Sequence, residues 1–175
     1  MSGLASDDIT PWLPPDELEF VRARVPMLYL DLLPVRVGAT GAVEEVGLLL
    51  RVSQGSLTRA LVSGRVLYHE TIRQAVVRHL EKDLGPLCLP RLAPSLQPLT
   101  VGEYFPTPGQ GFDDSRQHAV SLVYVVPIDG DCQPQQDTLE LSWFSPQAAL
   151  EPDVLAELVD GHEAVLRLAL SQAAR

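Results

Sequence analysis

The chain has 175 residues, a length that favours one domain of ordinary size. Hydrophobic residues make up 46% of it and charged residues 21%, a composition typical of globular proteins that argues against a disordered chain. The formal net charge of -10 leaves no general electrostatic attraction to polymeric nucleic acid or to an anionic membrane. Any phosphate group must therefore be bound locally, by a few arginines, by backbone amides or through a bridging metal.

No targeting segment is evident in the sequence. No apolar run approaches the roughly 18 residues that a membrane-spanning helix needs. Residues 1–8 carry neither a basic patch nor an apolar core, so we expect no secretory signal. Cys88 and Cys132 have no CxxC spacing, which predicts reduced thiols in a cytoplasmic protein rather than a zinc site or a disulfide framework.

Five apolar segments, several of them rich in branched side chains, predict strands. They are residues 27–37, 46–52, 100–105, 118–127 and 139–144. We expect the first to be interrupted near Pro34, because proline cannot donate a hydrogen bond to a neighbouring strand. Residues 60–62 form only a short apolar stretch, and residues 106–117, with two glycines and two aspartates, predict a polar loop.

Three segments with helical spacing of apolar residues predict helices. They are residues 16–25, 71–84 and 152–174. The second is the clearest, since Gly85 and Pro86 supply a C-cap glycine followed by a helix breaker. Strands on both sides of this central helix predict an α/β fold, a mixed sheet with helices on its faces. We expect residues 1–25 to form an N-terminal arm with a short helix and residues 26–175 to form the folded domain.

The common phosphate-binding and acyl-transfer signatures are absent. The sequence contains no GxxxxGK[ST] phosphate loop, no GxGxxG after a strand and no GxSxG nucleophile turn. Candidate chemistry therefore has to be sought on the central helix.

His79 and Asp83 are expected on the apolar side of the central helix. Because successive residues turn by 100°, these two lie about 40° apart, in the sector of Ile72, Val76 and Leu80. A carboxylate one turn from an imidazole fits a metal-binding pair. The alternative is a core histidine that is hydrogen bonded to Asp83 and binds no metal.

Residues 64–85 resemble the Nudix box, a loop–helix–loop with the pattern GX5EX7REUXEEXGU, in which U is a bulky aliphatic residue. The matching positions are Gly64, Glu70, Arg78, Leu80 and Gly85. In that family the glutamates of the REUXEE core hold Mg²⁺ or Mn²⁺ on the substrate pyrophosphate. Here those three positions are occupied by His79, Lys82 and Asp83, and Pro86 replaces the last aliphatic residue. The box is therefore degenerate at the positions that carry the family's chemistry.

The context of the box is also similar to that of Nudix proteins. An apolar strand and a glycine turn precede the helix, and an alternating strand opens at residues 116–118 (R-Q-H). Residues 140–145 (E-L-S-W-F-S), just before the closing helix, are typical of the family. The resemblance covers about residues 26–173 and implies a Nudix-type α/β/α sandwich with a mixed sheet.

The box further resembles that of the GDP-mannose hydrolase type of Nudix enzyme. That branch keeps the glycine, the first glutamate and the arginine, with one acidic residue before the closing glycine, where Asp83 stands here. In that branch the bond broken lies at the anomeric carbon of the sugar, and a loop histidine is the base. His118 or His69 could take that role, and the alternative for each is a histidine at the surface or at a strand edge.

The resemblance implies a divalent metal, Mg or Mn, with Glu70, His79 and Asp83 as its ligands. The two carboxylates suit either ion, whereas the nitrogen of His79 suits Mn²⁺ better. Lys82 either binds phosphate or is solvated. Arg78 is expected to pair with Glu70 and to hold the loop, a structural role.

Further candidates lie along the rest of the chain. As catalytic groups we consider Glu70, His118 and Glu103, with Glu140 as an extra ligand or base. Aromatic rings could stack on a nucleobase and arginines could meet phosphate oxygens. These substrate-binding candidates are Arg59, Arg65, Arg116, Tyr104, Phe105 and Phe144. The alternative for the aromatic residues is a place in the core.

Two functions stay open at this point. The first is a Nudix-like, divalent-metal-dependent hydrolase of a nucleoside diphosphate linked to another group, with a nucleotide sugar as one candidate. The second is a Nudix-fold protein that binds a nucleotide or metabolite without efficient hydrolysis. The retained Glu70, Arg78 and Asp83 favour the first function, and the missing glutamates favour the second. We expect a small nucleotide-type partner, neither polymeric nucleic acid nor a membrane, and a homodimer stays open.

Overall fold

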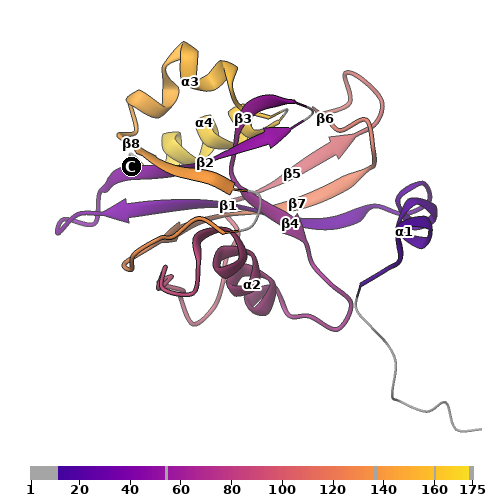
Figure 1. Ribbon diagram of the computed structural model, residues 1–175, viewed down its shortest axis with the longest axis horizontal. Helices are drawn as coiled ribbons and strands as arrows, with labels where there is room; N and C mark the ends of the chain where they lie inside the picture. Colours follow the sequence, from indigo (N-terminus) through magenta and orange to yellow (C-terminus); the bar gives the residue numbers. More distant parts are fainter. Residues whose placement is uncertain (1–11, 54, 136–137, 160, 174–175) are drawn as a thin grey trace, which may run out of the picture.

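The computed structural model describes residues 12–53, 55–135, 138–159 and 161–173 (Figure 1). Within these residues the strands are β1 (Met27–Val37), β2 (Val43–Ser53), β3 (Ser56–Ala60), β4 (Val62–Arg65), β5 (Thr100–Phe105), β6 (Phe112–Asp113), β7 (Ala119–Pro127) and β8 (Thr138–Phe144). The helices are α1 (Pro15–Arg22), α2 (Ile72–Leu84), α3 (Pro152–Ala156) and α4 (His162–Ala173), and a short 3-10 helix, η1, spans Ala148–Leu150.

Strand β1 is the centre of a mixed sheet. It pairs in parallel with β7, and β5 and then β6 extend the sheet beyond β7. On its other edge β1 pairs antiparallel with β4 through Leu32 and with β2 from Val35 onward. Strand β2 in turn pairs with β3 and β8. The sheet is therefore mixed, as the sequence predicts.

The expected interruption of the first strand at Pro34 is wrong, because β1 runs unbroken from Met27 to Val37. Leu33 and Pro34 lie where β1 has left β4 and has not yet joined β2. A missing N–H group at this point removes no ladder hydrogen bond on that edge. The change of partner strand explains why proline is tolerated in a central strand.

Alternate residues of β1 pack against two different helical layers. Leu30 and Leu32 belong to a core cluster with α2, whereas Leu33 and Val35 belong to a second cluster with α3 and α4. Figure 1 shows α2 on one side of the sheet and α3 and α4 on the other. The predicted α/β/α sandwich is confirmed.

The closing helix differs from the prediction of one helix over residues 152–174. It is divided into α3 and α4, and Gly161 lies between them with a φ of 82°, in the left-handed region. A Cβ atom at Gly161 would lie 2.5 Å from Tyr104 Cε1. Apolar periodicity continues across the break, which is why the sequence suggested a single helix.

Three short strands were missed by the sequence analysis. Strands β3 and β4 replace the short apolar stretch expected at residues 60–62, and β6 lies inside the expected loop of residues 106–117. These segments are too short to show a period of two, and their pairing with β2, β1 and β5 makes them strands.

The N-terminal helix α1 has no buried residue. The division of the chain at residues 25 and 26 stays a prediction, and residues 1–11 of the expected arm lie outside the described part. No helix of that part is long and apolar enough to cross a membrane.

Candidate functional site

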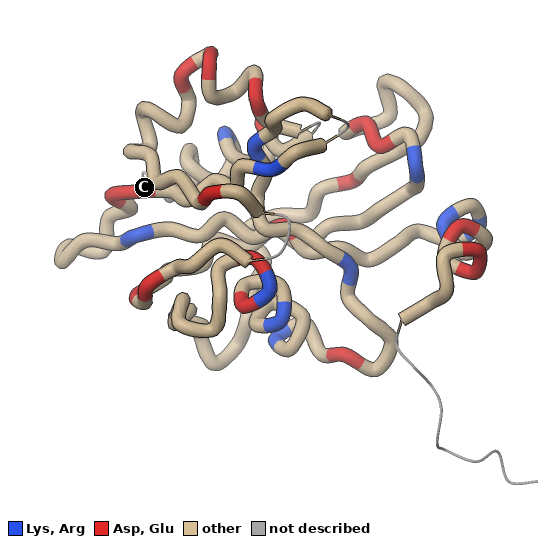
Figure 2. The backbone as a smooth tube through the Cα atoms, in the orientation of Figure 1, with Lys and Arg blue, Asp and Glu red and all other residues tan. Residues whose placement is uncertain are grey.

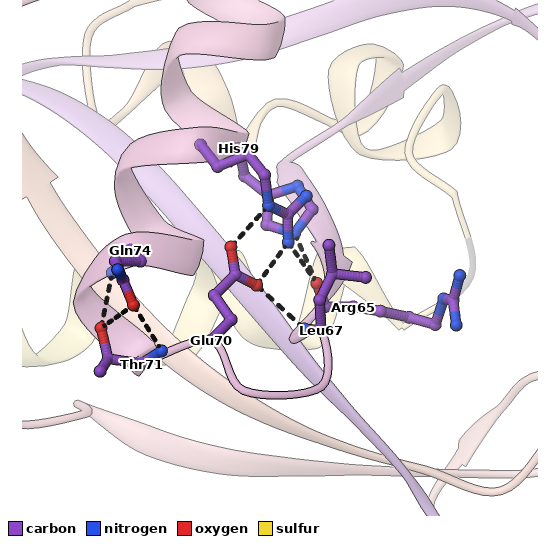
Figure 3. A network of polar contacts seen from close by, with 7 residues as sticks. Arg65, Leu67, Glu70, Thr71, Gln74 and His79 are labelled. Atoms are coloured by element: carbon purple, nitrogen blue, oxygen red, sulfur yellow. Dashed lines mark hydrogen bonds and ion pairs between the residues drawn. The ribbon is translucent and has the colours of Figure 1, made fainter. Parts of the chain in front are cut away.

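The box is built from the end of β4, a loop and helix α2 (Figure 3). The helix opens with a capping box: the Thr71 hydroxyl accepts a hydrogen bond from the Gln74 amide, and the Gln74 side chain accepts one from the Thr71 amide. It ends at Gly85, whose φ of 88° suits glycine. The T-x-x-Q spacing in the sequence was a usable signal for this cap.

Glu70 joins the loop to the helix. Its Oε1 accepts a hydrogen bond from Arg78 Nε at 2.6 Å, and its Oε2 accepts from Arg78 Nη2 at 2.7 Å and from the Leu67 amide at 2.9 Å. The hydrogen bonds from Arg78, helped by the Leu67 amide and opposed by burial, hold the pKa of Glu70 below its ordinary value. The predicted pairing of Arg78 with Glu70 is confirmed.

His79 is buried beneath the loop, with 4% of the residue exposed. Its Nε2 lies 2.9 Å from the Arg65 carbonyl oxygen, which also accepts a hydrogen bond from Arg78 Nη2. Because a carbonyl only accepts, Nε2 carries the hydrogen and Nδ1 carries the lone pair. Burial lowers the pKa of His79, and the charges of Arg78 and Lys82 act in the same direction, so the neutral ring is favoured.

Gly64 makes room for this imidazole. A Cβ atom at position 64 would lie 2.0 Å from His79 Cε1 and 2.6 Å from each ring nitrogen. The first glycine of the box and the histidine that replaces its second glutamate are therefore matched in shape.

Asp83 is the centre of a buried ion-pair cluster that we call the Asp83 corner, formed by Arg51, Lys82 and Asp83. Asp83 Oδ2 lies 2.7 Å from Arg51 Nη2, and its Oδ1 lies 3.2 Å from Lys82 Nζ. The side chain of Asp83 is 2% exposed, against 26% for Arg51 and 33% for Lys82. The contact with Arg51 has the distance of an ion pair but not the angles of a hydrogen bond, since neither atom has a hydrogen-bond partner among the described residues.

The residues proposed as metal ligands do not fit a resident Mg²⁺ or Mn²⁺ as they are arranged. Both carboxylate oxygens of Glu70 are hydrogen bonded, both oxygens of Asp83 are ion paired, and Nε2 of His79 is bonded to the Arg65 carbonyl. Nowhere in the described part do three or more His, Cys, Asp or Glu side chains form a group that could hold a metal ion. Metal dependence stays a prediction.

The candidate Tyr104 lies on the other face of the sheet from α2. It is 6% exposed, and its hydroxyl donates a hydrogen bond to Asp31 Oδ2 at 2.9 Å. Burial, with the charge of Asp31 and its hydrogen bond, raises the pKa of Tyr104. Tyr104 therefore has the surroundings of a core residue, which was the alternative to a substrate-binding role.

The remaining candidates divide between the two ends of the sheet. Phe144 is partly buried, and the Arg59 guanidinium lies 5.0 Å from its ring centroid. The Phe105 ring stacks on His118, with the ring centroids 4.5 Å apart, and His118 Nε2 is buried without a partner among the described residues. Glu103 is exposed on β5.

The register of the sheet relates the box to the loop that precedes β7. Tyr29 of β1 pairs with Arg65 of β4 on one side and with Ser121 of β7 on the other. The hydroxyl of Tyr29 lies 3.4 Å from Gln117 Oε1, and next to it Arg116 pairs with Asp114 at 2.9 Å. The structure thus brings Arg65 and residues 114–118 to one end of the sheet, at the start of the box loop.

Comparisons with known proteins place the chain in a family. The family model of a domain of unknown function, DUF4916, matches residues 8–175. The chain belongs to the DUF4916 family. No curated protein matches this DUF4916 chain.

Solved structures similar to this DUF4916 protein include Nudix domains. It is 55% identical to a protein from Jonesia denitrificans described as a possible asymmetric diadenosine tetraphosphate (Ap4A) hydrolase, with a TM-score of 0.84 over 87% of this chain and 97% of that one. The Nudix domain of Shewanella oneidensis NrtR, in complex with ADP ribose, is 17% identical, with a TM-score of 0.61 over 91% and 93% of the two chains.

A third similar structure is a bifunctional NMN adenylyltransferase/ADP ribose pyrophosphatase from Francisella tularensis, in complex with AMP and a Mn ion. It is 15% identical, with a TM-score of 0.63 over 90% of this chain and 45% of that one. The two distant likenesses concern the fold alone. Together with the Jonesia protein they confirm the predicted Nudix-type fold, while the resemblance to the GDP-mannose type stays a prediction.

Proposed function

We propose that this chain recognises a nucleoside diphosphate linked to a second group, and that its box binds this ligand more effectively than it cleaves it. The observation that carries the proposal is the Asp83 corner, where the one acidic residue left in the core of the box is neutralised by Arg51 and Lys82. A carboxylate with both oxygens ion paired offers a metal ion little. Binding of the ligand does not need that carboxylate to be free.

The nucleotide class of the ligand is supported by the surroundings of the box. The Arg65 side chain points away from the polar network of the loop (Figure 3), at the end of the sheet where Arg116 and His118 lie. Arginine forks suit phosphate oxygens, and the Phe105–His118 stack is an aromatic surface of the kind that nucleobases stack on. ADP-ribose and Ap4A, the compounds named for the similar Shewanella and Jonesia proteins, both contain such linked phosphates.

A second candidate function is divalent-metal-dependent hydrolysis of the same class of compound. It is favoured by 55% identity to a protein described as a possible Ap4A hydrolase. When bound, Mg²⁺ or Mn²⁺ would neutralise the pyrophosphate and activate water. For this function Asp83 would have to be released from Arg51 and Lys82, and His118 and Glu103 would be the candidate general bases.

A paired measurement of binding and turnover separates the two functions. ADP-ribose, Ap4A and GDP-mannose are added to the protein with Mg²⁺, with Mn²⁺ or with EDTA, and the melting temperature is recorded for each. Cleavage is followed by chromatography of the nucleotide products, since hydrolysis of these compounds releases nucleotides and sugars or sugar phosphates rather than free phosphate. A raised melting temperature without cleavage supports recognition. Turnover at about 1 s⁻¹ or faster, the lower end of typical enzymes, would replace recognition by hydrolysis.

A further inference from the structure

Unsatisfied buried polar atoms are concentrated at the Asp83 corner. Among the described residues, eight buried side-chain nitrogen and oxygen atoms lack a hydrogen-bond partner. Five of these atoms belong to four residues: Arg51, His79, Asp83 and Thr138. Arg51 Nη2 and Asp83 Oδ2 form an ion pair with each other, which leaves Arg51 Nε, His79 Nδ1 and Thr138 Oγ1 without a polar partner among the described residues. Because buried polar groups are nearly always hydrogen bonded, these three atoms mark a place where a further polar group fits.

The four residues are neighbours from three different elements. Arg51 of β2 pairs in register with Thr138 of β8 and forms the ion pair with Asp83 of α2. His79 lies one turn before Asp83 on the same helix, and both residues face the core. The atoms without a polar partner include one guanidinium nitrogen, Arg51 Nε, and the Thr138 hydroxyl, both of which are hydrogen-bond donors.

The charge of the Asp83 corner has the sign that attracts an anion. Arg51 and Lys82 contribute two positive charges against the single negative charge of Asp83, and His79 beside them is neutral. Basic residues are present along α2, whereas the chain as a whole carries a net charge of -10 (Figure 2). Lys82, with 33% of its side chain exposed, is the solvent-facing member of the cluster, whereas Asp83 is 2% exposed and Nε and Nη2 of Arg51 are buried.

We propose that Lys82 binds the diphosphate of the ligand directly, in place of a divalent cation, while Arg51 neutralises Asp83. The inference rests on the proposed function and names how its ligand is held. Lys82 reaches Asp83 from the solvent side at 3.2 Å and can turn its ammonium to a phosphate oxygen, while Arg51 keeps Asp83 neutralised. A fixed cation then supplies the positive charge that, in the family pattern, comes from the metal ion held by the glutamates.

Calorimetric titration with inorganic pyrophosphate in the presence of EDTA tests this inference. The wild-type protein is expected to bind, and millimolar Mg²⁺ is expected to weaken binding because Mg²⁺ complexes pyrophosphate in solution. The substitution Lys82→Ala should raise Kd at least tenfold, about 1.4 kcal/mol, whereas Lys82→Arg should keep most of the affinity. Arg167→Ala is the matched control: Arg167 is an exposed arginine of α4 paired with Glu163, and its loss should leave Kd unchanged.

The outcomes separate the inference from the proposed function. Binding that requires Mg²⁺ or Mn²⁺, or binding that Lys82→Ala does not weaken, would overturn the inference and leave nucleotide recognition intact. No binding of pyrophosphate, ADP-ribose or Ap4A under any condition would overturn both. If circular dichroism shows that Lys82→Ala is unfolded, Lys82→Gln replaces it in the same comparison. Glutamine keeps the first two methylene groups of lysine but carries no charge.

Discussion

Two buried aspartates on opposite faces of the sheet are satisfied in different ways. Asp31 of β1 belongs to the face covered by α4, and Asp83 of α2 belongs to the face covered by the box helix; each is 2% exposed. Asp31 faces the Tyr104 hydroxyl and the His162 imidazole, whereas Asp83 faces Arg51 and Lys82, whose side chains are more exposed than its own. The comparison separates an aspartate whose partners are themselves buried from one whose partners reach the surface.

Asp31 contacts side chains from two other elements, β5 and α4. The Tyr104 hydroxyl donates to one carboxylate oxygen, and His162 Nε2 lies 3.6 Å from the other. His162 Nδ1 accepts a hydrogen bond from the Leu61 amide at 3.1 Å, so Nε2 carries the hydrogen that faces Asp31. Burial acts to raise the pKa of Asp31, but the hydrogen bond and charge of His162 outweigh it, and the pKa lies below its ordinary value.

The largest expected effect comes from removing each carboxylate in turn. Asp83→Ala leaves the partly buried guanidinium of Arg51 without its counter-charge and should cost about 3 kcal/mol of unfolding free energy. Asp31→Asn keeps the size of the side chain and loses charge-assisted hydrogen bonds, so it should cost about 2 kcal/mol. Urea unfolding measures both values. Combining Asp83→Ala with Arg51→Met should recover part of the loss, and an equal or greater loss in the double variant would contradict the ion-pair account.

The next largest effect is the stabilisation of the folded protein by added pyrophosphate. Pyrophosphate at 100 times its Kd should stabilise the wild-type protein by about 2.7 kcal/mol without added metal, because a ligand that binds only the folded state stabilises it. In Lys82→Glu the stabilisation by pyrophosphate should vanish, and Mn²⁺ alone should begin to raise the melting temperature. Asp31→Asn should keep the wild-type response. A wild-type protein stabilised by Mn²⁺ alone would contradict the contrast between the two aspartates.

A somewhat smaller effect is expected at the contact between Gly64 and His79. Gly64→Ala would place a methyl group 2.0 Å from His79 Cε1, so the ring must move, at a cost of about 1–3 kcal/mol. His79→Ala should be destabilising on its own but should remove the clash, so Gly64→Ala should cost little in that background. Thermal unfolding of the four proteins in the double-mutant cycle measures the coupling between the two positions. If the two stability losses are simply additive, the His79 ring can move away from the new methyl group without cost, and the clash is not confirmed.

The smallest effect is a dependence of stability on acid pH. Because the pKa of Asp31 is lower in the folded protein than its ordinary value of 3.8, the unfolded chain takes up the proton first as the pH falls. The contribution of Asp31 is therefore fully present above that ordinary value and is lost as the pH falls below it. Asp31→Asn should reduce the acid slope of the unfolding free energy, measured by urea titration from pH 6 to pH 3. An unchanged slope would assign acid sensitivity to other carboxylates.

The box and the sandwich were accessible from the sequence because their signals are local. Apolar alternation in residues 118–127 and helical spacing in residues 71–84 depend on neighbours within one element. The Gly64, Glu70 and Arg78 spacing likewise predicted the link between loop and helix, since the ion pair joins two residues of one short segment. Short strands and the break at Gly161 were missed because pairing and packing partners distant in the chain decide them.

The charge and hydrogen bonding of the site depend on contacts between residues that are distant in the sequence. The sequence by itself determined that three glutamate positions hold His79, Lys82 and Asp83, and hence that the box departs from its family pattern. Only the tertiary structure brought Arg51 from β2 to within 2.7 Å of Asp83 and put the Arg65 carbonyl against His79. The physical reason is that burial and Coulomb interaction depend on distance in space, and residues 51 and 83 become neighbours only when the helix packs on the sheet.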